Sequence, residues 1–410
     1  MSLRILWVKM GGLWPPTSGG RLRSFHIVSE LARHHRVTLL TTHGPSDDPD
    51  ELRAQLQGCA RIDSLPYGIP KSGSAQFAVT LLRSWMSTQP VDVFKFRLPA
   101  LSREVRQLVK GGAVDVCVAD FLSATPNVPF DSPVPAVFFA HNVEHQIWKR
   151  LAERARRPWE RMFLDHEWRK LRRYEAQVCA RAVLTAAVSD ADRSLLAADA
   201  PGAAVRTIPT GVDTAYFAPD GMREAPNEIV FTGSMDWYPN EDAVQHFADA
   251  ILPRIRREVP DASFTVVGRN PTRRLRATLA GKNIRVTGTV DDVRPYIAGA
   301  AVFAVPLGIG GGTRLKIFEA LAMGKAVLSS TIGAEGLPLV PGEHFVRADE
   351  PEEFASAVVS LLRDPNRRRR LGAAGRQLVE ERFSWQEVAR RFADLCTEAV
   401  TAGHRTPGPQ

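Results

Sequence analysis

The stretch that decides the fold reads Gly310-Gly311-Gly312-Thr313-Arg314-Leu315-Lys316-Ile317-Phe318-Glu319. It follows an apolar run at 301–305, and this order is typical of a buried strand, a glycine-rich loop and a helix. Thr313 is expected to cap a helix over 314–323, with Gly324 at its end. In an open α/β sheet, ligands bind beyond the carboxyl end of such a strand.

Two cations in the first turn of this expected helix break a local rule. The helix dipole is positive there, so Arg314 and Lys316 each oppose it by a few tenths of a kcal/mol. The N–H groups of the three glycines form an anion site at the same end, and a bound diphosphate would remove the conflict. Glu319 lies one turn deeper, where it could accept hydrogen bonds from ribose hydroxyls. The stretch therefore predicts the phosphate- and ribose-binding corner of a nucleotide-sugar site. The alternative is a plain turn followed by a solvated helical face.

Short apolar runs alternate with amphipathic stretches along the chain. The runs are rich in Val, Ile, Phe or Ala, which is typical of strands buried on both faces of a parallel sheet. Helical patterns separate them, for example at 21–33 and 243–257. The alternation predicts the α/β class with right-handed crossovers. The expected strands are 5–8, 37–41, 114–119, 136–140 and 183–188 in the first half, and 229–232, 264–267, 284–287, 301–305 and 326–329 in the second.

The alternation breaks at 208–227, a segment rich in proline, glycine and aspartate. This break predicts a linker over 209–227 between an N-terminal domain, 1–208, and a C-terminal domain, 228–383. A last helix over 384–403 is expected to begin at Ser384 as its N-cap. The tail 404–410 is expected to be disordered.

The bulk composition is that of an ordinary globular protein. The 410 residues are 44% hydrophobic and 24% charged, enough apolar material for two cores. Four scattered cysteines have no metal-type or disulfide-type spacing, which indicates reduced residues of a cytosolic protein. No run reaches the roughly 18 apolar residues of a spanning helix, and the first residues are interpreted as a strand rather than a signal peptide. The net charge of +8 favours an anionic partner without choosing one.

Further motifs agree with the glycine-rich stretch. Together with 310–327, they resemble the retaining GT-B-fold glycosyltransferases of the family 4 type, the group 1 glycosyl transferases, over most of the chain. The motifs are Ile208-Pro209-Thr210-Gly211-Val212-Asp213, Ala187-Val188-Ser189, Val286-Thr287-Gly288-Thr289-Val290, His141-Asn142 after an apolar run, and Gly19-Gly20 after the first strand.

This resemblance implies a GT-B fold, with two Rossmann-like, doubly wound parallel-sheet domains facing a cleft. The C-terminal domain would hold the nucleotide-sugar donor, the N-terminal domain the acceptor, and the final helix would cross back to the first domain. The loop of Gly288 and Val290 would contact the nucleobase, and His141 would be the active-site histidine. No metal or other cofactor is expected, because the family neutralises the diphosphate with a helix dipole and basic side chains.

The chain departs from the family pattern in two places. Gly311 stands where the family often has the first carboxylate of a Glu-x7-Glu motif, so glycine N–H groups would replace it. The usual Arg and Lys are also missing after the first strand of the second domain, at 233–240. Arg314 and Lys316 would then be relocated charges that serve the same diphosphate.

Other residues keep two interpretations from sequence. His141 either caps a helix or hydrogen-bonds the donor sugar or its leaving phosphate. Asp120 ends an apolar run and either orients the acceptor hydroxyl or caps the next turn. Gly19 and Gly20 either form a simple turn or let the backbone approach the donor phosphates. Gly268, after another strand, is interpreted as a turn.

The stretch 148–173 combines many arginines and lysines with Trp148, Trp159, Phe163 and Trp168. One interpretation is peripheral contact with an anionic membrane and a lipid-linked acceptor. The other is a solvated helical face whose aromatic residues pack inward, since acidic residues dilute the charge. No motif resembles a nucleic-acid-binding module, and none is expected as a partner.

The sequence thus predicts sugar transfer from a nucleotide-diphosphate sugar to a hydroxyl of a glycan, lipid-linked or small-molecule acceptor, with retention. No carboxylate is a convincing nucleophile, so a same-face mechanism is expected. The alternatives are a nucleotide-sugar epimerase on the same scaffold and a non-catalytic sugar-nucleotide-binding partner subunit. The expected location is the cytoplasm, with peripheral attachment to the inner face of the cell membrane as an option.

Overall fold

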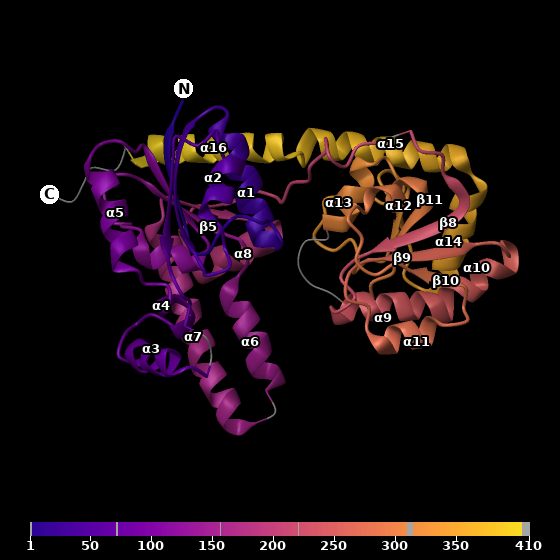
Figure 1. The fold of residues 1–410 in the computed structure, drawn as a ribbon, viewed down its shortest axis with the longest axis horizontal. Helices are drawn as coiled ribbons and strands as arrows, with labels where there is room; N and C mark the ends of the chain where they lie inside the picture. The colour runs from indigo at the N-terminus through magenta and orange to yellow at the C-terminus, as the bar shows by residue number, and fades with distance from the viewer. Residues whose placement is uncertain (1, 71–72, 156, 220, 310–314, 404–410) are drawn as a thin grey trace. The chain divides into compact units, whose positions relative to one another are not determined.

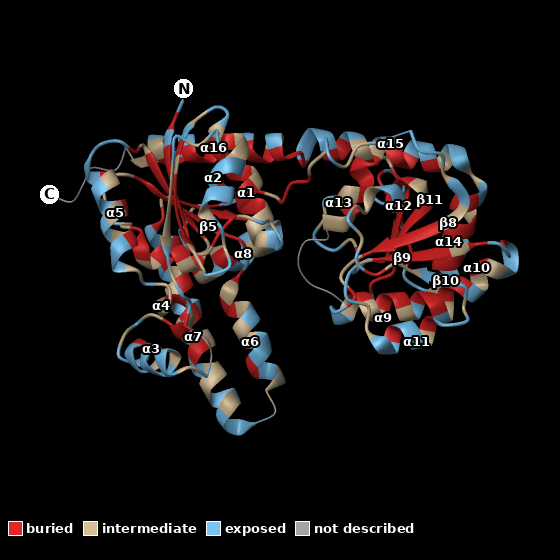
Figure 2. Ribbon diagram, in the orientation of Figure 1, coloured by how far each residue is buried: buried red, intermediate tan, exposed pale blue. Residues whose placement is uncertain are grey.

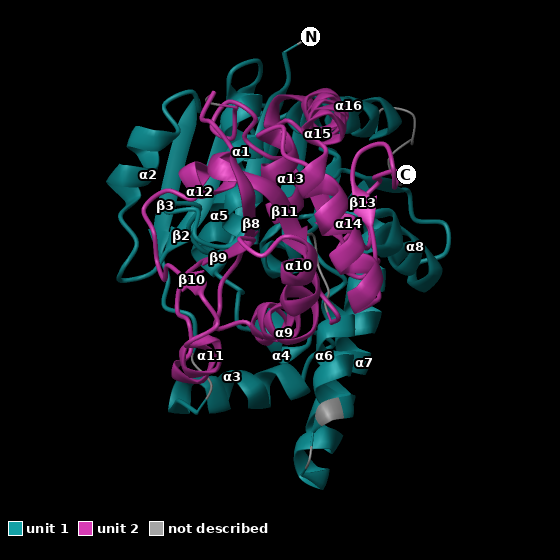
Figure 3. Cartoon of the chain, turned by 90° about the vertical axis from the view of Figure 1, so that its right-hand side faces the viewer, with its two compact units in different colours: residues 1–209, 388–410 teal, residues 210–387 magenta. Residues whose placement is uncertain are grey.

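The computed structural model describes residues 2–70, 73–155, 157–219, 221–309 and 315–403 (Figure 1). Internal contacts divide the chain into two compact units (Figure 3). Unit 1 comprises residues 1–209 and 388–410, and unit 2 comprises residues 210–387. The predicted tail 404–410 lies outside the described residues.

Unit 1 is built on a seven-stranded sheet of order β3-β2-β1-β4-β5-β6-β7. Every pair is parallel, as the short apolar runs predicted. The sequence did not predict β3 and β7, which lie at the two edges and are less apolar. The strands are β1 Arg4–Lys9, β2 Arg36–His43, β3 Arg61–Pro66, β4 Val116–Asp120, β5 Ala136–Ala140, β6 Leu184–Ala187 and β7 Val205–Thr207.

The helices of unit 1 connect these strands. They are α1 Gly19–Ala32, α2 Pro49–Gln55, α3 Ala75–Trp85, α4 Val91–Phe94, α5 Pro99–Lys110, the 3-10 helix η1 Leu122–Asn127, α6 Glu144–Arg154, α7 Pro158–Arg181 and α8 Asp190–Asp199. The expected helix 21–33 begins two residues earlier, because Ser18 is the N-cap and accepts a hydrogen bond from the Arg21 N–H. Gly19 and Gly20 therefore belong to the first helical turn.

Unit 2 contains a six-stranded sheet of order β10-β9-β8-β11-β12-β13, again parallel throughout. Its strands are β8 Ala225–Thr232, β9 Ser263–Val267, β10 Ile284–Val286, β11 Ala300–Val305, β12 Val327–Ser329 and β13 Val346–Arg347. Its helices are α9 Tyr238–His246, the π-helix η2 Phe247–Ile251, α10 Leu252–Glu258, α11 Arg273–Leu279, α12 Arg294–Gly299, α13 Leu315–Ala322, α14 Pro351–Arg363 and α15 Pro365–Arg382.

The predicted linker 209–227 extended too far. β8 begins at Ala225, and Pro226 lies inside it. A proline is tolerated there because pairing with β9 starts only at Glu228, so the missing N–H costs no bond to that neighbour. The proline signal in the sequence therefore concealed the start of a central strand.

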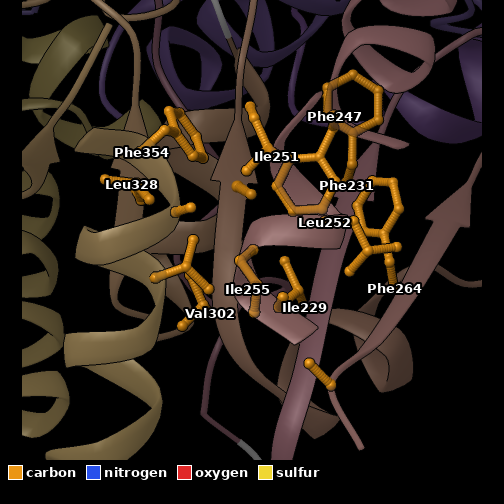
Figure 4. Packing of buried hydrophobic residues seen from close by; sticks show 14 of the residues in the cluster. Ile229, Phe231, Phe247, Ile251, Leu252, Ile255, Phe264, Val302, Leu328 and Phe354 are labelled. Carbon is orange, nitrogen blue, oxygen red and sulfur yellow. The ribbon is translucent and has the colours of Figure 1, made fainter. Parts of the chain in front are cut away.

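Apolar residues fill both faces of the unit 2 sheet (Figure 2). On one face, residues from the strands pack against residues from η2, α10 and α14 (Figure 4). The ring centroids of Phe247 and Phe264, for example, lie 4.3 Å apart. The labelled members of this cluster are Ile229, Phe231, Phe247, Ile251, Leu252, Ile255, Phe264, Val302, Leu328 and Phe354.

The last helix, α16 (Trp385–Gly403), begins as the sequence predicted. The Ser384 hydroxyl accepts a hydrogen bond from the Glu387 N–H at 3.3 Å, as an N-cap does. From Val388 onward the helix belongs to unit 1. Phe392 packs there against Trp7 and Phe139, with ring centroids 5.1 and 5.0 Å away. The expected return of the final helix to the first domain is confirmed.

The end of α13 is packed tightly against α15 through two glycines. Gly324 has φ +68°, which favours glycine and ends the helix where the sequence predicted. A Cβ at Gly372 would lie 1.9 Å from the Gly324 carbonyl oxygen. No side chain fits there without a backbone shift.

We expect Gly372→Ala to lower the free energy of unfolding by about 1–3 kcal/mol, the usual cost of overpacking. Urea unfolding of the purified chain measures this change. Gly299→Ala is the matched control in the same unit, because its Cβ would meet only the Met222 sulfur at 3.7 Å. Equal stability of the two variants would contradict the packing argument.

Candidate functional site

The sheet of unit 2 reverses its strand order beside β8. The chain runs from β8 to β9 on one side and later returns to β11 on the other. Loops that leave the carboxyl ends of two such strands diverge, and ligands bind in the resulting crevice. The loop after β8 and the start of α13 meet at this point.

The structure describes only the second half of the predicted phosphate-binding stretch 310–319. Gly310, Gly311, Gly312, Thr313 and Arg314 lie outside the described residues. Their predicted contacts with a diphosphate therefore remain predictions. From Leu315 onward, α13 is a regular helix, as expected.

Lys316 reaches the loop that follows β8. Its Nζ donates to Oδ1 of the buried Asn240 at 2.8 Å and lies 4.0 Å from the Phe231 ring centroid. A Cβ at Gly233 would be only 2.7 Å from the same nitrogen. The ammonium group thus lies beside Gly233, in the stretch where the resemblance implies an Arg and a Lys. The action of Lys316 on a diphosphate remains a prediction.

Glu319 lies on α13 one turn after Lys316, as the spacing predicted. Its side chain is half-buried. Burial raises the pKa of Glu319 to about 7, and the nearby Lys316 only partly opposes this shift. A carboxyl group with this pKa changes its charge near neutral pH, so a hydrogen-bonding ligand would influence its protonation.

The loop of Gly288 and Val290 leaves β10 at the same edge of the sheet. Gly288 has φ +77°, a conformation that favours glycine. Val290 is half-buried and packs against the core cluster on the other face of the sheet. Packing therefore explains Val290, while contact of this loop with a nucleobase stays a prediction.

Gly268 is needed for a close backbone contact, and not only for the predicted turn. A Cβ there would lie 1.7 Å from the Gly233 carbonyl oxygen, so the loops after β8 and β9 touch backbone to backbone. Arg269 follows, and its Nε donates to the Ser234 hydroxyl at 2.9 Å. Sequence reasoning missed Gly268, Arg269 and Asn240. The available signal was a glycine directly after each of two apolar runs.

Unit 1 reverses its strand order between β1 and β4, and a charged cluster fills that position. Lys9 is the last residue of β1, Asp120 the last of β4, and His141 follows β5. Arg23 comes from α1 and completes the cluster. All four side chains are buried.

Asp120 is the centre of this cluster. Its Oδ1 lies 2.7 Å from His141 Nε2, and its Oδ2 lies 3.3 Å from Lys9 Nζ. Trp7 Nε1 also donates to Oδ2 at 2.8 Å. On the far side of the imidazole, an Arg23 guanidinium nitrogen lies 2.9 Å from Nδ1. Asp120 is fully buried and neither caps η1 nor faces solvent.

The charges in this cluster stabilise one another. Burial would raise the pKa of Asp120, but Lys9 and His141 outweigh it and hold that pKa well below its usual value. Burial also lowers the pKa of Lys9 and that of Arg23, the latter to about 10, while Asp120 opposes both shifts. The pKa of His141 is lowered to about 3, mainly by burial. His141 is therefore neutral at physiological pH.

The neutral imidazole has only one arrangement that suits both partners. A guanidinium donates, so Nδ1 must accept from Arg23, and the ring hydrogen sits on Nε2 and is donated to Asp120. Both ring nitrogens thus have protein partners, and the residue is 2% exposed. A direct contact of His141 with a donor sugar remains a prediction that would need this arrangement to open.

Gly20 and Phe121 form one wall of the cluster. The Phe121 ring stacks on His141 with centroids 3.6 Å apart, and Lys9 Nζ lies 4.1 Å from the same ring. A Cβ at Gly20 would be 2.4 Å from Phe121 Cζ, whereas a Cβ at Gly19 would meet nothing within 4 Å. Phe121 also has φ 70°, unusual for an aromatic residue. The missing side chain at Gly20 therefore makes room for the Phe121 ring, whereas the space beside Gly19 is empty.

Two protein-family models match the chain. The model described as Glycosyltransferase Family 4 matches residues 18–216, and the model described as Glycosyl transferases group 1 matches residues 226–364. One match falls almost wholly in unit 1 and the other in unit 2. The chain belongs to the group 1, family 4 type glycosyltransferases.

Curated relatives of this glycosyltransferase match over part of their length. A phosphatidyl-myo-inositol mannosyltransferase of Mycobacterium leprae is 32% identical over 218 residues, 50% of this chain and 57% of the relative. An MMP alpha-(1->4)-mannosyltransferase of Mycolicibacterium hassiacum is 30% identical over 271 residues, 63% of this chain and 64% of the relative. The first relatives found are thus spanned over little more than half of their length.

Solved structures agree on the fold of this glycosyltransferase. Anabaena HepE in complex with UDP is similar with a TM-score of 0.64 at 14% identity, over 97% of this chain and 100% of that one. Sucrose-phosphate synthase of Thermosynechococcus elongatus gives 0.67 at 15%, with the same coverage. These likenesses establish the GT-B fold.

Among the described residues, no group of three or more His, Cys, Asp and Glu side chains could hold a metal ion. Within the same residues, no helix is long and apolar enough to cross a membrane. The four cysteines are free thiols.

We expect the buried His141 to make the glycosyltransferase less stable in acid. Its pKa is about 3 in the fold and about 6.5 in an unfolded chain, so the unfolded state binds more protons between these values. The free energy of unfolding should therefore fall as the pH drops below about 6.5, by up to about 1.4 kcal/mol per pH unit. Urea unfolding between pH 7 and pH 4 measures the slope.

The difference between wild type and His141→Gln isolates this contribution, because half-buried carboxyl groups such as Glu144 and Glu319 act in the opposite direction. The pKa values of these two groups are raised, chiefly by burial. The difference in the free energy of unfolding between wild type and His141→Gln should become smaller as the pH falls. His166→Gln, at an exposed position on α7, is the control for replacing a histidine elsewhere in unit 1. A parallel His141→Gln profile would disprove the buried neutral imidazole.

Proposed function

We propose that the protein transfers a sugar from a nucleotide-diphosphate sugar to a hydroxyl acceptor, with retention at the anomeric carbon. The observation that carries this proposal is the position of Lys316, whose ammonium group lies beside Gly233 at the switch point of the unit 2 sheet. An ammonium group at the carboxyl ends of parallel strands suits a diphosphate.

Unit 2 would bind the nucleotide and the diphosphate of the donor. Lys316, Arg314 and the N–H groups of the glycine stretch would neutralise the diphosphate, without a metal ion or other cofactor. Glu319 would accept hydrogen bonds from the ribose hydroxyls one turn deeper. The backbone around Gly288 would contact the base.

The chemical step would occur on one face of the sugar. The bond from the anomeric carbon to the phosphate oxygen breaks, a bond to the acceptor oxygen forms, and the acceptor proton passes to the departing phosphate. Positive charge beside the diphosphate stabilises the transition state, because negative charge grows there as the bond breaks. No carboxylate nucleophile is required by this route.

The relatives suggest where to begin with the donor. Several are named as GDP-mannose-dependent mannosyltransferases acting on phosphatidylinositol mannosides. GDP-mannose is therefore the first donor to test, with UDP-glucose as the second. The acceptor would be a glycan or a lipid-linked glycan, and peripheral contact with an anionic membrane would bring the latter within reach.

A thermal-shift screen of nucleotide sugars, followed by product analysis, tests the reaction class. A ligand that binds only the native state raises the melting temperature. Transfer to an added acceptor with a retained anomer supports the proposal. Release of an epimerised nucleotide sugar without acceptor would indicate an epimerase, and binding with neither hydrolysis nor transfer would indicate a partner subunit.

We expect Lys316→Met to lower kcat by about 10²–10³, the scale for losing one preorganised charge stabiliser. Arg314→Ala should act in the same direction. Steady-state kinetics with the donor from the screen measures both. Lys282→Met is the matched control, because Lys282 is a surface residue paired with Asp249 and should leave kcat within about twofold. Unchanged turnover of Lys316→Met would refute the diphosphate clamp.

We expect the affinity for GDP to depend on the protonation of Glu319. Ribose hydroxyls donate to the ionised carboxylate, but the pKa of Glu319 is about 7. Below that pH, binding must first remove a proton, so affinity should fall by up to about tenfold per pH unit. Isothermal titration calorimetry at pH 6, 7 and 8 measures this. Glu319→Gln should lose this pH dependence of the affinity. If the variant keeps the pH dependence of wild type, the ribose is bound elsewhere.

A further inference from the structure

Three helices of unit 1 form a projection that extends away from the sheet (Figure 1). α6 and α7 pack against each other, so the basic stretch 148–173 is divided between two helices. α3 lies beside α7, where Lys170 Nζ donates to the Ser84 carbonyl oxygen at 2.6 Å. We call residues 75–86 and 144–181 the helical projection.

The helical projection exposes apolar side chains at unusual density. Of the 17 large hydrophobic residues exposed in the described chain, eight lie on it, although it is a small part of that chain. Met86 is 89% exposed, Met162 72% and Trp159 62%. α3 reads Ala-Gln-Phe-Ala-Val-Thr-Leu-Leu-Arg-Ser-Trp, yet Ser84 is its only buried residue (Figure 2). Patches of this kind mark interaction surfaces.

A groove with a basic lining runs along α7 beside the end of α3. Its volume is about 840 Å³. Trp85 and Met162 contribute apolar walls, and Arg161, Arg169 and Arg173 follow one another at four-residue spacing on α7. Residues four apart share a helix face, so the three guanidinium groups line one side of the groove.

The three groove arginines share one property. Among the described residues, no carboxylate lies within 4.0 Å of the guanidinium nitrogens of Arg161, Arg169 or Arg173. The neighbouring Arg172, on another face of α7, is paired with Asp199 at 2.6 Å. Asp165 also lines the groove, and its Oδ1 accepts from Trp168 Nε1 at 2.9 Å. The lining therefore carries more positive than negative charge, and its three exposed arginines are not held in ion pairs.

Two acidic residues of α7 are buried and do not offset this charge, whereas Glu160 and Asp165 on the same helix are half-buried. Glu167 and Glu175 are each 1% exposed. Glu175 lies 2.7 Å from His145 Nδ1, and Glu167 accepts from the Val91 N–H at 2.8 Å. Both carboxylates are used inside the unit. The exposed surface of the helical projection is therefore more basic than its residue composition suggests.

We propose that the helical projection docks on the surface of an anionic lipid bilayer. Trp85, Met86, Trp159 and Met162 enter the interfacial region, and Arg161, Arg169 and Arg173 meet lipid phosphates. An anionic bilayer offers negative charge directly beside apolar chains, the combination that this groove and its rim present. A second copy of the chain would instead bring like charges together.

The proposal deepens the acceptor side of the proposed function, because it delivers the protein to lipid-linked acceptors. Binding to vesicles is measured without donor or acceptor, so its failure would leave sugar transfer intact. Loss of transfer to soluble acceptors would likewise leave membrane binding intact.

The test is co-sedimentation of the full chain with phosphatidylcholine vesicles that contain or lack 30% phosphatidylglycerol, at low and at 0.5 M salt. We expect binding to the anionic vesicles only, and at least tenfold weaker binding at high salt. Absence of binding to anionic vesicles, or equal binding to neutral ones, would overturn the proposal.

Two sets of exposed variants locate the surface. Arg161→Gln/Arg169→Gln/Arg173→Gln should weaken binding by about 100-fold, at about fivefold per cation. Trp159→Ser/Met162→Ser should weaken it by at least tenfold. The controls are Arg369→Gln/Arg370→Gln on α15 and Leu195→Ser/Val340→Ser, at exposed positions outside the helical projection, which should bind as wild type.

Thermal unfolding verifies that every variant is folded. Light scattering distinguishes a different occupant of the surface. If wild type forms a dimer that Trp159→Ser/Met162→Ser abolishes, while no variant changes vesicle binding, the surface is an interface between copies and the membrane proposal is wrong.

Discussion

The reversal of strand order beside the first strand of each sheet is the constraint on which both units depend. At β1 and at β8 the neighbouring connections run in opposite directions, so the carboxyl ends of the strands are left uncovered by crossover helices. Polar side chains can collect there without interrupting the apolar layers above and below. The sheets form the rigid framework of each unit, and the polar groups lie at the carboxyl ends of the strands.

The two units use this position differently. Unit 1 fills it with Lys9, Asp120, His141 and Arg23, whose charges and hydrogen bonds are directed at one another. Unit 2 instead brings glycine backbone into contact at Gly233 and Gly268 and adds one ammonium group. The first arrangement is a closed polar network that fixes geometry. The second leaves a half-buried ammonium group at the strand ends, and this is the observation on which the proposal of a donor site in unit 2 rests.

Much of this could be predicted from local patterns, because buried parallel strands are continuous apolar runs and Gly324 and Ser384 have local capping signatures. The charged cluster could not, since Arg23 and His141 are 118 residues apart and only the fold joins them. The polar edge strand β3 and the exposed helix α3 also escaped prediction, because neither shows the buried apolar pattern of its class. The burial of Glu167 and Glu175, which weakens the argument that acidic residues dilute the charge of α7, likewise depends on tertiary contacts.

The return of α16 to unit 1 has a consequence for biosynthesis. Trp7 of β1 is synthesised before unit 2, whereas Phe392 of α16, which packs against it, is synthesised after unit 2. The core of unit 1 thus stays incomplete until unit 2 has been made, although domains generally fold as they emerge. Unit 2 has all of its residues earlier and can fold first. The nascent N-terminal unit is therefore the part of the chain with the longest need for chaperone protection.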